Sequence, residues 1–454
     1  MRSALVLAVL AAMPAAMARA QSLEPPPFTS MRWQEDYSYL ADPAKRSGAW
    51  WERLKYIESP RAAGTYLALG DEFRLRYQQI WNNDFASKGR TEGYPMLRWS
   101  PYVDLVAGRL RFFGQMLASY SGRSAETRSP ATDQTGLEVS QAFIDWRVPH
   151  DEGRLTLRGG REIIEYGSQR LIGSGGANTR QMFDGGLARW EYGAWRVDVS
   201  ALRPVTLRSE SFSDTADRTK KLWLLYATHA PLDLYYVGFE NDIAVFNQGA
   251  GRERRHTFGA RLFGARERWS VDAEANVQTG ELSGADIRAG SADAALRYTA
   301  NESRYQPFFE MRANVMSGDR DPNDRRLGTF NAMFPTAQYF GDIALFGPAN
   351  LVNLRPNFGA QLDARTKLSG ALTLYWRQSL GDGIYGPAIN LMRPDGGSTA
   401  RYVGTQADVA LDWSYNRNVS LRLVYNVFVP GRYVKETGPG DTIHFVQATV
   451  TFKY

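Results

Sequence analysis

The chain of 454 residues contains no cysteine and only four histidines. The absence of cysteine excludes a disulfide framework and any thiolate metal site. The histidines, His150, His229, His256 and His444, are scattered without the spacing of a metal site and without an adjacent serine on one strand. The sequence therefore predicts no metal and no cofactor.

Long apolar runs and a strong excess of one charge are also missing. Beyond residues 1–20, no apolar stretch approaches the ~18 residues of a transmembrane helix. The 54 Lys and Arg residues against 48 Asp and Glu residues give a net charge of +6. Without the two arginines of residues 1–20, 52 basic and 48 acidic residues leave +4. This mild balance argues against a nucleic-acid partner.

Residues 1–20, "MRSALVLAVLAAMPAAMARA", have the pattern of a secretory signal peptide. Arg2 precedes a short apolar run, and Ala18-Arg19-Ala20 forms a small-x-small cleavage site. The alternative is an N-terminal membrane anchor, which the short run and Pro14 disfavour. Since no cysteine follows the cleavage site, we expect no lipid anchor.

Apolar and polar residues alternate along most of the remaining chain. In "WSVDAEANVQTG", Trp269, Val271 and Ala273 fall on one face. Ser270 and Asp272 fall on the other, and "KLSGALTLYWRQS" and "VSLRLVYNVFVPG" repeat the pattern. Alternation over ~10 residues matches the length that a tilted strand needs to cross a bilayer.

The alternation predicts about 18 strands, an even number, as in bacterial outer-membrane barrels. They are 67–80, 97–106, 109–120, 137–148, 154–162, 186–192, 195–203, 221–229, 233–241, 256–264, 268–278, 291–299, 305–316, 353–363, 368–378, 402–413, 419–429 and 443–454.

The predicted connections alternate between short and long. The short ones include 107–108, 193–194 and 265–267, and the long ones include 163–185, 317–352 and 379–401. Short periplasmic turns and long outer loops are typical of an up-and-down transmembrane barrel. The last strand ends on Tyr454, where the signal for barrel assembly usually has Phe.

These patterns divide the chain into three parts: a signal peptide at 1–20, a periplasmic lead-in or cap at 21–66, and an all-β outer-membrane barrel at 67–454. Within the cap, "GAWWERLKYI" predicts a short amphipathic helix at the periplasmic mouth or within the lumen.

The polar faces of the predicted strands point into the lumen of such a barrel, because lipid requires an apolar exterior. Barrels of ~16–18 strands leave an aqueous channel. Any single inward arginine can be an ion-paired wall residue, but several in one constriction would select anions. The candidates on strands are Glu72, Arg74, Arg76, Arg111, Arg147, Arg312 and Arg377.

The stretch "YGSQRLIGSGGANTRQMFDGG", residues 166–186, is glycine-rich and falls in a long connection. It lacks the Gly-Lys-Ser/Thr ending of a phosphate loop, and no helical pattern follows. A disordered linker and an ordered, inward-folded loop remain. The ordered loop would carry Arg170 and Arg180 into the lumen, with Asp184 pairing locally.

This stretch resembles the outer-membrane alginate export porins in three motifs: Gly160-Arg161-Glu162, the run at 166–173, and the run at 180–185. Residues 32–80 are also similar, although Gly70-Asp71-Glu72 replaces the usual Gly-Gly-Glu. The resemblance implies an 18-stranded barrel with an arginine-bearing pore that exports an acidic polysaccharide. By matching positions it implies pore arginines and acid partners at Arg74, Arg161, Arg170, Arg180, Arg189, Glu162, Glu165, Asp184 and Glu191.

Other functions remain open from sequence alone. The chain could be an uptake porin for small acids, sugars or aromatics, a membrane-embedded hydrolase, or a soluble secreted binding protein. Glu162 and Glu165 could act as paired glycosidase carboxylates, but a charge pair in the wall is favoured. The expected partners are outer-membrane lipid, acidic polysaccharide or small anionic solutes, and periplasmic export proteins.

Overall fold

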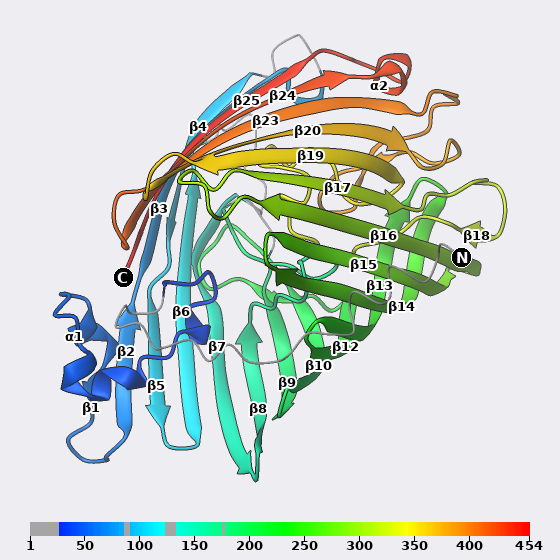
Figure 1. Ribbon diagram of the computed structural model, residues 1–454. Coiled ribbons are helices and arrows are strands. Elements are labelled where there is room, and N and C mark those ends of the chain that lie inside the picture. The colour runs from blue at the N-terminus through cyan, green and yellow to red at the C-terminus, as the bar shows by residue number, and fades with distance from the viewer. Residues whose placement is uncertain (1–26, 86–90, 123–132, 175–177) are drawn as a thin grey trace, which may run out of the picture.

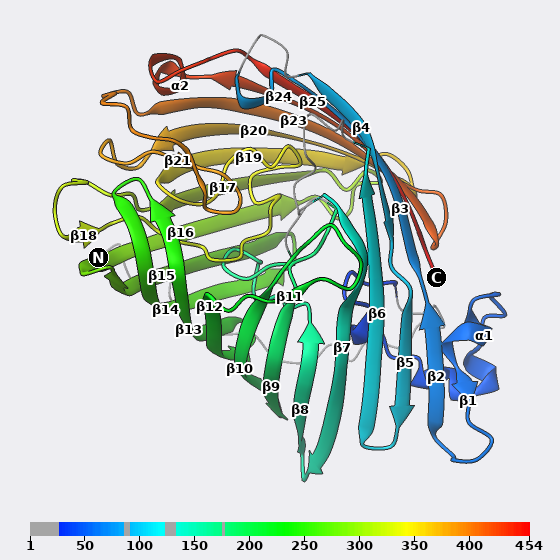
Figure 2. The same cartoon turned by 180° about the vertical axis from the view of Figure 1, so that it is seen from behind.

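A computed structural model describes residues 27–85, 91–122, 133–174 and 178–454. The predicted signal peptide, residues 1–20, lies outside these ranges. No helix in the described ranges is long and apolar enough to cross a bilayer. Nearly all regular structure is β-strand, in one large sheet that closes on itself (Figures 1 and 2).

The described chain forms a closed antiparallel barrel of 18 strands, which confirms the predicted fold. Two of the 18 barrel strands are interrupted, so each is made of two shorter strands. The first consists of β2 (Thr65–Gly70) and β3 (Glu72–Trp81), and the second consists of β4 (Glu92–Trp99) and β5 (Tyr102–Ala107). The others are β6 (Leu110–Ser121), β7 (Thr135–His150), β8 (Gly153–Glu162), β9 (Phe183–Tyr192), β10 (Trp195–Thr206), β12 (Lys220–His229), β13 (Leu232–Phe246), β14 (Gly249–Arg266), β15 (Trp269–Leu282), β16 (Ala285–Thr299), β17 (Phe308–Met316), β19 (Leu351–Gln361), β20 (Thr366–Arg377), β23 (Tyr402–Ser414), β24 (Val419–Pro430) and β25 (Ile443–Lys453).

Short strands and short helices lie between or beside the barrel strands. Besides β1 (Ile57–Glu58), β11 (Thr215–Ala216) and β18 (Arg326–Leu327), the pair β21 (Ile384–Tyr385) and β22 (Leu391–Arg393) forms a separate small sheet. The helical segments are η1 (Arg32–Gln34), η2 (Ser38–Ala41), η3 (Pro43–Lys45), α1 (Glu52–Lys55), η4 (Asn83–Phe85) and α2 (Arg432–Glu436).

The wall is apolar outside and mostly polar inside. On β7, Ile144 and Trp146 are 56% and 50% exposed, whereas the alternating Phe143 and Asp145 are each 1% exposed. Exposed large apolar side chains recur on nearly every crossing, as expected for contact with lipid. The sheet therefore has the two-faced pattern that the alternation predicts.

The hairpins β13–β14 and β15–β16 continue beyond their predicted limits at the long-loop end. β14 begins at Gly249 rather than at 256, and β16 begins at Ala285 rather than at 291. Four of the seven residues added to β14 and two of the six added to β16 are charged, and most of the others are glycine or alanine. Apolar alternation therefore does not detect them, although their backbones still pair.

The long connections fold back into the barrel, which the sequence predicted only for 166–186. A bridge joins Ile172 to Phe334, so the connections after β8 and β17 meet inside. Figures 1 and 2 show these connections inside the barrel. Together with wall residues such as Phe239 and Phe428, they form a large apolar cluster at the long-loop end of the lumen. The lumen is therefore partly filled there.

The barrel closes where β25 pairs with β3, from Lys453 opposite Glu72 to His444 opposite Trp81. Beyond this seam β25 ends, but the first crossing continues as β2. β1 covers the free edge of β2 by pairing Ile57 with Leu67. Such covering prevents an open edge from recruiting another strand.

The N-terminal segment docks on the lumen side of β2. Trp51 and Tyr37 pack against Tyr66 and Ala68. The Nη2 atom of Arg32 donates to the Tyr454 carbonyl at 2.7 Å, which ties the segment to the last residue of the chain. The described part of the predicted cap is therefore a packed element of the barrel mouth.

Gly160, near the end of β8, has a backbone conformation and a close backbone contact that only glycine tolerates. Its φ of 138° and an added Cβ only 2.2 Å from the Ala142 carbonyl oxygen leave no space for a side chain. We expect Gly160→Ala to destabilise the barrel by about 1–3 kcal/mol. The folded barrel and the heat-unfolded chain migrate as different bands on a gel (heat modifiability). The fraction of folded band across a urea titration in detergent measures the effect.

Gly159 provides the matched control, since an added Cβ meets nothing within 4 Å. Gly159→Ala should unfold at the same urea concentration as the unmodified chain. Equal midpoints for the two variants would contradict the strained conformation at Gly160.

Candidate functional site

A cavity of about 380 Å³ lies in the lumen toward the short-turn end, and we call it the basic cavity. Six cationic side chains and two carboxylates line it. The cationic residues are Arg74, Arg76, Arg98, Arg180, Arg422 and Lys453, and the acidic residues are Glu72 and Asp412. Cations therefore outnumber acids three to one in this cavity.

Strand register brings like charges together in the basic cavity. Arg74 on β3 lies directly opposite Arg98 on β4, and both side chains are buried. Directly opposed like charges destabilise a sheet, so the arrangement departs from what stability alone would favour. Glu72 offsets part of the charge, because it contacts Arg98 and lies 3.5 Å from Lys453 Nζ.

Arg98 also has unused hydrogen-bonding capacity. Its buried Nε atom has no hydrogen-bond partner within the described residues. A buried donor without a partner is unfavourable, and buried guanidinium groups normally use every N–H. The described part of the wall thus leaves one N–H of Arg98 unpaired, while Glu72 contacts Nη2 of the same guanidinium group.

The glycine-rich connection after β8 delivers Arg180 to the same cavity. Arg180 Nη1 donates to the Ser30 carbonyl at 2.8 Å. Asn178 fixes the loop, since its Oδ1 accepts from Arg74 Nη2 at 2.9 Å and its Nδ2 donates to the Leu97 and Asp133 carbonyls. The loop thus places Arg180 at the lining of the basic cavity.

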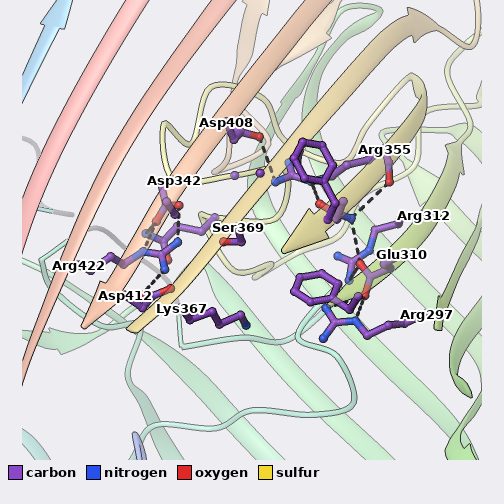
Figure 3. Close-up of a pocket in the computed structure, with 18 of the residues that line it drawn as sticks. Arg297, Glu310, Arg312, Asp342, Arg355, Lys367, Ser369, Asp408, Asp412 and Arg422 are labelled. Carbon is purple, nitrogen blue, oxygen red and sulfur yellow. Dashed lines mark hydrogen bonds and ion pairs between the residues drawn. The ribbon is translucent and has the colours of Figure 1, made fainter. Parts of the chain in front are cut away.

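A second cavity of about 360 Å³ adjoins the basic cavity, with Asp412 and Arg422 lining both (Figure 3). Its charges are balanced in close pairs. Arg422 lies 2.8 Å from Asp342 and 2.6 Å from Asp412, and Arg355 lies 3.0 Å from Asp408. This second cavity is polar but carries little net charge.

A third cavity of about 400 Å³ lies beneath Trp33 of the N-terminal segment. Among the described residues, four of its six arginines have individual acid partners, and four carboxylates line it, compared with two in the basic cavity. Arg111 pairs with Asp104 at 2.7 Å, and Arg158 pairs with Asp145 at 2.7 Å. The positive excess is thus concentrated in the basic cavity.

A larger cavity of about 750 Å³ lies toward the long-loop end and is mainly apolar. Phe239, Phe334 and Ile389 contribute to its lining, and Arg76 lines both this cavity and the basic cavity. A solute entering from the long-loop end would meet apolar surface before it met the arginines.

Most predicted site residues lie on the lumen side. Glu162 pairs with Arg158 at 3.1 Å, Arg189 with Asp198 at 2.7 Å, and Arg312 with Glu310 at 3.5 Å. Arg76 Nε donates to Thr449 at 3.2 Å. Arg147 and Glu191 line the third cavity. Glu165 lies in the connection after β8, close enough to Arg180 for their charges to interact.

Arg170 enters the lumen as predicted, but it anchors its loop to the wall. Its Nη1 atom lies 3.3 Å from Glu274 and 3.4 Å from Asp272, and its Nε atom lies 3.8 Å from Asp293. Three surrounding carboxylates compensate this arginine, so it adds no net positive charge to the lumen.

Arg161 and Arg377 were predicted to line the pore, and the structure places neither of them on a passage; Asp184 does pair with an arginine, as expected of an acid partner, but outside the lumen. β7 and β8 pair without a bulge, so side chains alternate between the two faces of β8 along its whole length. Arg158 points into the lumen, and Arg161, three residues later, therefore points to the lipid-facing side. There it pairs with Asp184 at 2.7 Å. Arg377 is 1% exposed and donates to the carbonyls of loop residues such as Ala400, so it organises a loop rather than lining a passage.

Arg98, Asn178, Arg422 and Lys453 are site residues that the sequence did not reveal. Arg98 falls at the start of a predicted strand, and its inward facing becomes clear only from its pairing with Arg74. Asn178 carries no charge, and its clamp depends on a loop path that no periodicity encodes.

Two histidines belong to the exterior of the wall. His256 Nδ1 lies 2.8 Å from the Tyr236 hydroxyl, and His444 Nδ1 lies 2.9 Å from the Tyr425 hydroxyl. In the described part of the chain, no group of three or more His, Asp or Glu side chains could hold a metal ion.

A closed barrel with an apolar exterior and charged internal cavities defines an outer-membrane channel protein. A family model for alginate export matches residues 65–448, and the chain belongs to that family. No curated protein sequence matches the chain. Family and fold point to a transport channel rather than to an enzyme.

Solved structures of outer-membrane porins share the fold. OpdO of Pseudomonas aeruginosa aligns with a TM-score of 0.55 at 11% identity, over 86% of this chain and 97% of its own. OccAB1 of Acinetobacter baumannii aligns with a TM-score of 0.58 at 9% identity, over 88% and 99%. OpdK of Pseudomonas aeruginosa, solved with vanillate, aligns with a TM-score of 0.55 at 9% identity, over 85% and 98%.

Two carboxyl groups join the connections that fill the long-loop end. Asp382 Oδ2 accepts from the backbone N–H of Asp319 at 3.0 Å and from Thr329 at 2.6 Å. Asp319 Oδ1 accepts from the N–H of Gly328 at 3.0 Å. Burial raises the pKa of Asp319 to about 6, and the nearby Asp382 carboxylate adds to the shift.

This raised pKa predicts that loop packing depends on pH. The folded state holds a proton on Asp319 that the unfolded loop releases, so the stabilisation is present at low pH and is lost as pH rises through about 6. Amide exchange across 317–330, corrected for intrinsic rates, should be several-fold slower at about pH 5 than at about pH 7.5. Asp319→Asn, which mimics the protonated form, should abolish the difference; a difference retained in this variant would contradict the assignment.

Proposed function

We propose that this chain is an outer-membrane channel that passes acidic solutes through an arginine-lined lumen. The observation that carries the proposal is the opposed pair Arg74 and Arg98, which Arg180 joins from the inward-folded loop. The planar guanidinium fork can bind carboxylates with two hydrogen bonds. The excess of cations over carboxylates in the basic cavity supports an anion as the passing solute.

An acidic polysaccharide such as a polyuronate is the substrate class that membership in the alginate export family supports. Each sugar of a polyuronate carries one carboxylate. A chain moving through the lumen would present successive carboxylates to the basic cavity and then to the adjoining balanced cavity. Weak, repeated sites of this kind allow entry without trapping.

A second candidate, the uptake of small aromatic acids, is favoured by the apolar cavity. Phe239 and Phe334 offer aromatic surface on the route to the basic cavity, whereas a polyuronate has no aromatic ring to place there. The vanillate in the OpdK structure shows an aromatic acid bound to a barrel of the same fold. Both candidates use the same arginines.

Ion selectivity in planar bilayers tests the shared proposal. We expect the unmodified channel to prefer anions, and Arg74→Gln and Arg180→Gln each to lower the anion-to-cation permeability ratio about two- to fivefold. Arg312→Gln is the matched control, because it removes the same charge from the lumen near Glu310 and outside the basic cavity. Its effect should be clearly smaller.

Unchanged or cation-selective currents would sink the proposal of an arginine-lined anion path. Current block distinguishes the two substrate classes. Block by an oligouronate but not by vanillate supports polysaccharide export, and the reverse supports uptake of aromatic acids.

A further inference from the structure

A second cluster of arginines lies outside the lumen, at the long-loop end of β10. Arg203, Arg208 and Arg218 line an open hollow there, together with Thr206, Thr215, Ala216 and Asp217. β11 pairs with the last residues of β10 and forms part of its rim (Figure 2). None of the sequence motifs pointed to these residues.

The alternation along β10 places Arg203 on the outer surface of the wall. Leu202 is buried within the lumen cluster, and the residue after it faces the opposite way. Val199, on the same face as Arg203, is 51% exposed and pairs with Leu225, which is 46% exposed. Arg203 therefore stands directly above the apolar band that lipid covers.

The three guanidinium groups have carboxylates nearby, but within the described ranges none of them forms a close ion pair. Asp184 lies opposite Arg203 in the sheet, and Asp214 lies close enough to Arg208 for their charges to interact. Arg203 Nη1 donates to the Arg218 carbonyl at 3.3 Å. Asp217, the one acid in the hollow, is 3.2 Å from Lys220 and also accepts from Thr219. Arg208 and Arg218 are exposed, so the hollow presents positive charge outward.

The positive surface continues along the neighbouring strands. Leu202 pairs with Leu222 on β12, and Lys221 directly precedes Leu222. Lys221 lies 3.0 Å from Glu240. Arg254 and Arg252 approach the same carboxylate at 3.0 and 3.7 Å, although Arg252 also reaches Asp242. Two carboxylates, those of Glu240 and Asp242, thus face three exposed cations. We call this surface the outer-rim patch; it comprises Arg203, Arg208, Arg218, Lys221, Arg252 and Arg254.

The position of the outer-rim patch relative to the bilayer indicates which part of the lipid it contacts. Short turns lie on the periplasmic side of such barrels and long loops outside, so the patch lies at the headgroups of the outer leaflet. Charges on the outer wall are tolerated at the interface and disfavoured at the bilayer centre. Arginine forks match phosphate oxygens, and clustered cations recognise phosphorylated headgroups.

We propose that the outer-rim patch binds the phosphate groups of an outer-leaflet glycolipid, whose acyl chains lie along the apolar wall below. The apolar pair Val199 and Leu225 lies beneath the patch and would contact those chains. The site is independent of the lumen and of the transported solute. It would fix the barrel to its annular lipid on one side.

Native mass spectrometry of the full chain in detergent tests this site with three probes: bisphosphorylated lipid A, dephosphorylated lipid A and inorganic phosphate. The unmodified chain should retain bisphosphorylated lipid A. The double variant Arg208→Gln with Arg218→Gln should bind it about tenfold more weakly, because phosphate loses two charged donors. This variant leaves the Arg203 hydrogen bonds in place.

Arg432→Gln is the matched control, since Arg432 is exposed at the same end of the barrel but pairs with Glu436 on α2. It should bind lipid A normally. The heat-modifiable gel shift verifies that each variant is folded. If the double variant does not fold, the single variants provide the comparison, each with a loss of about threefold.

Three results would overturn the proposal: equal binding by the folded arginine variants, equal retention of dephosphorylated lipid A, or displacement of lipid A by an equal concentration of inorganic phosphate. The last would identify a site for soluble anions. Selective retention of the phosphorylated lipid, lost in the variants alone, would support it.

Discussion

The hydrogen-bonded seam between β25 and β3 is the contact on which the rest of the structure depends. Lipid offers no partners to backbone N–H and C=O groups, so the sheet is stable in a bilayer only when it is closed. The seam ends where Asp71 and Tyr454 exchange backbone hydrogen bonds. Because the first crossing continues beyond that point, the chain needs a cover for β2, and β1 and the segment around Arg32 supply it. The role of the N-terminal segment thus follows from where the last strand stops.

Closure also determines where charge can be placed. Residues that alternate with lipid-facing positions must point inward, and most inward arginines are balanced by a carboxylate on a neighbouring strand, as Arg111 is by Asp104. The pair Arg74 and Arg98 departs from this arrangement, because register places the two arginines opposite each other, even though Glu72 contacts Arg98. A sheet selected for stability alone would separate them. The local excess of positive charge is therefore the part of the lumen that stability does not explain, and such departures are expected at functional sites.

Alternation predicted the barrel well because each strand repeats the same two-residue pattern under the same constraint from lipid. It could not predict cross-strand register, so Arg98 was missed. The motif match that implied Arg161 as a pore residue says nothing about which face of β8 a side chain occupies, so Arg161 was misplaced. Arg377 does face inward, but the loop carbonyls that enclose it come from residues distant in sequence. The apolar filling around Phe334 was equally hidden, since loop paths leave no periodic signal. Local pattern thus determined the wall, and long-range contacts determined the site.

The arginines of this barrel differ in chemistry because of where they stand, not because of how many there are. Arg170 is neutralised by three carboxylates, Arg98 retains a buried donor without a partner, and Arg218 projects outward with no ion pair among the described residues. The whole chain carries only a mild positive charge, yet that charge is unevenly distributed. Balanced pairs stiffen the wall, and two uncompensated clusters remain, one within the lumen and one on the outer rim. Net charge averages over these three environments, so it says little about what either cluster binds.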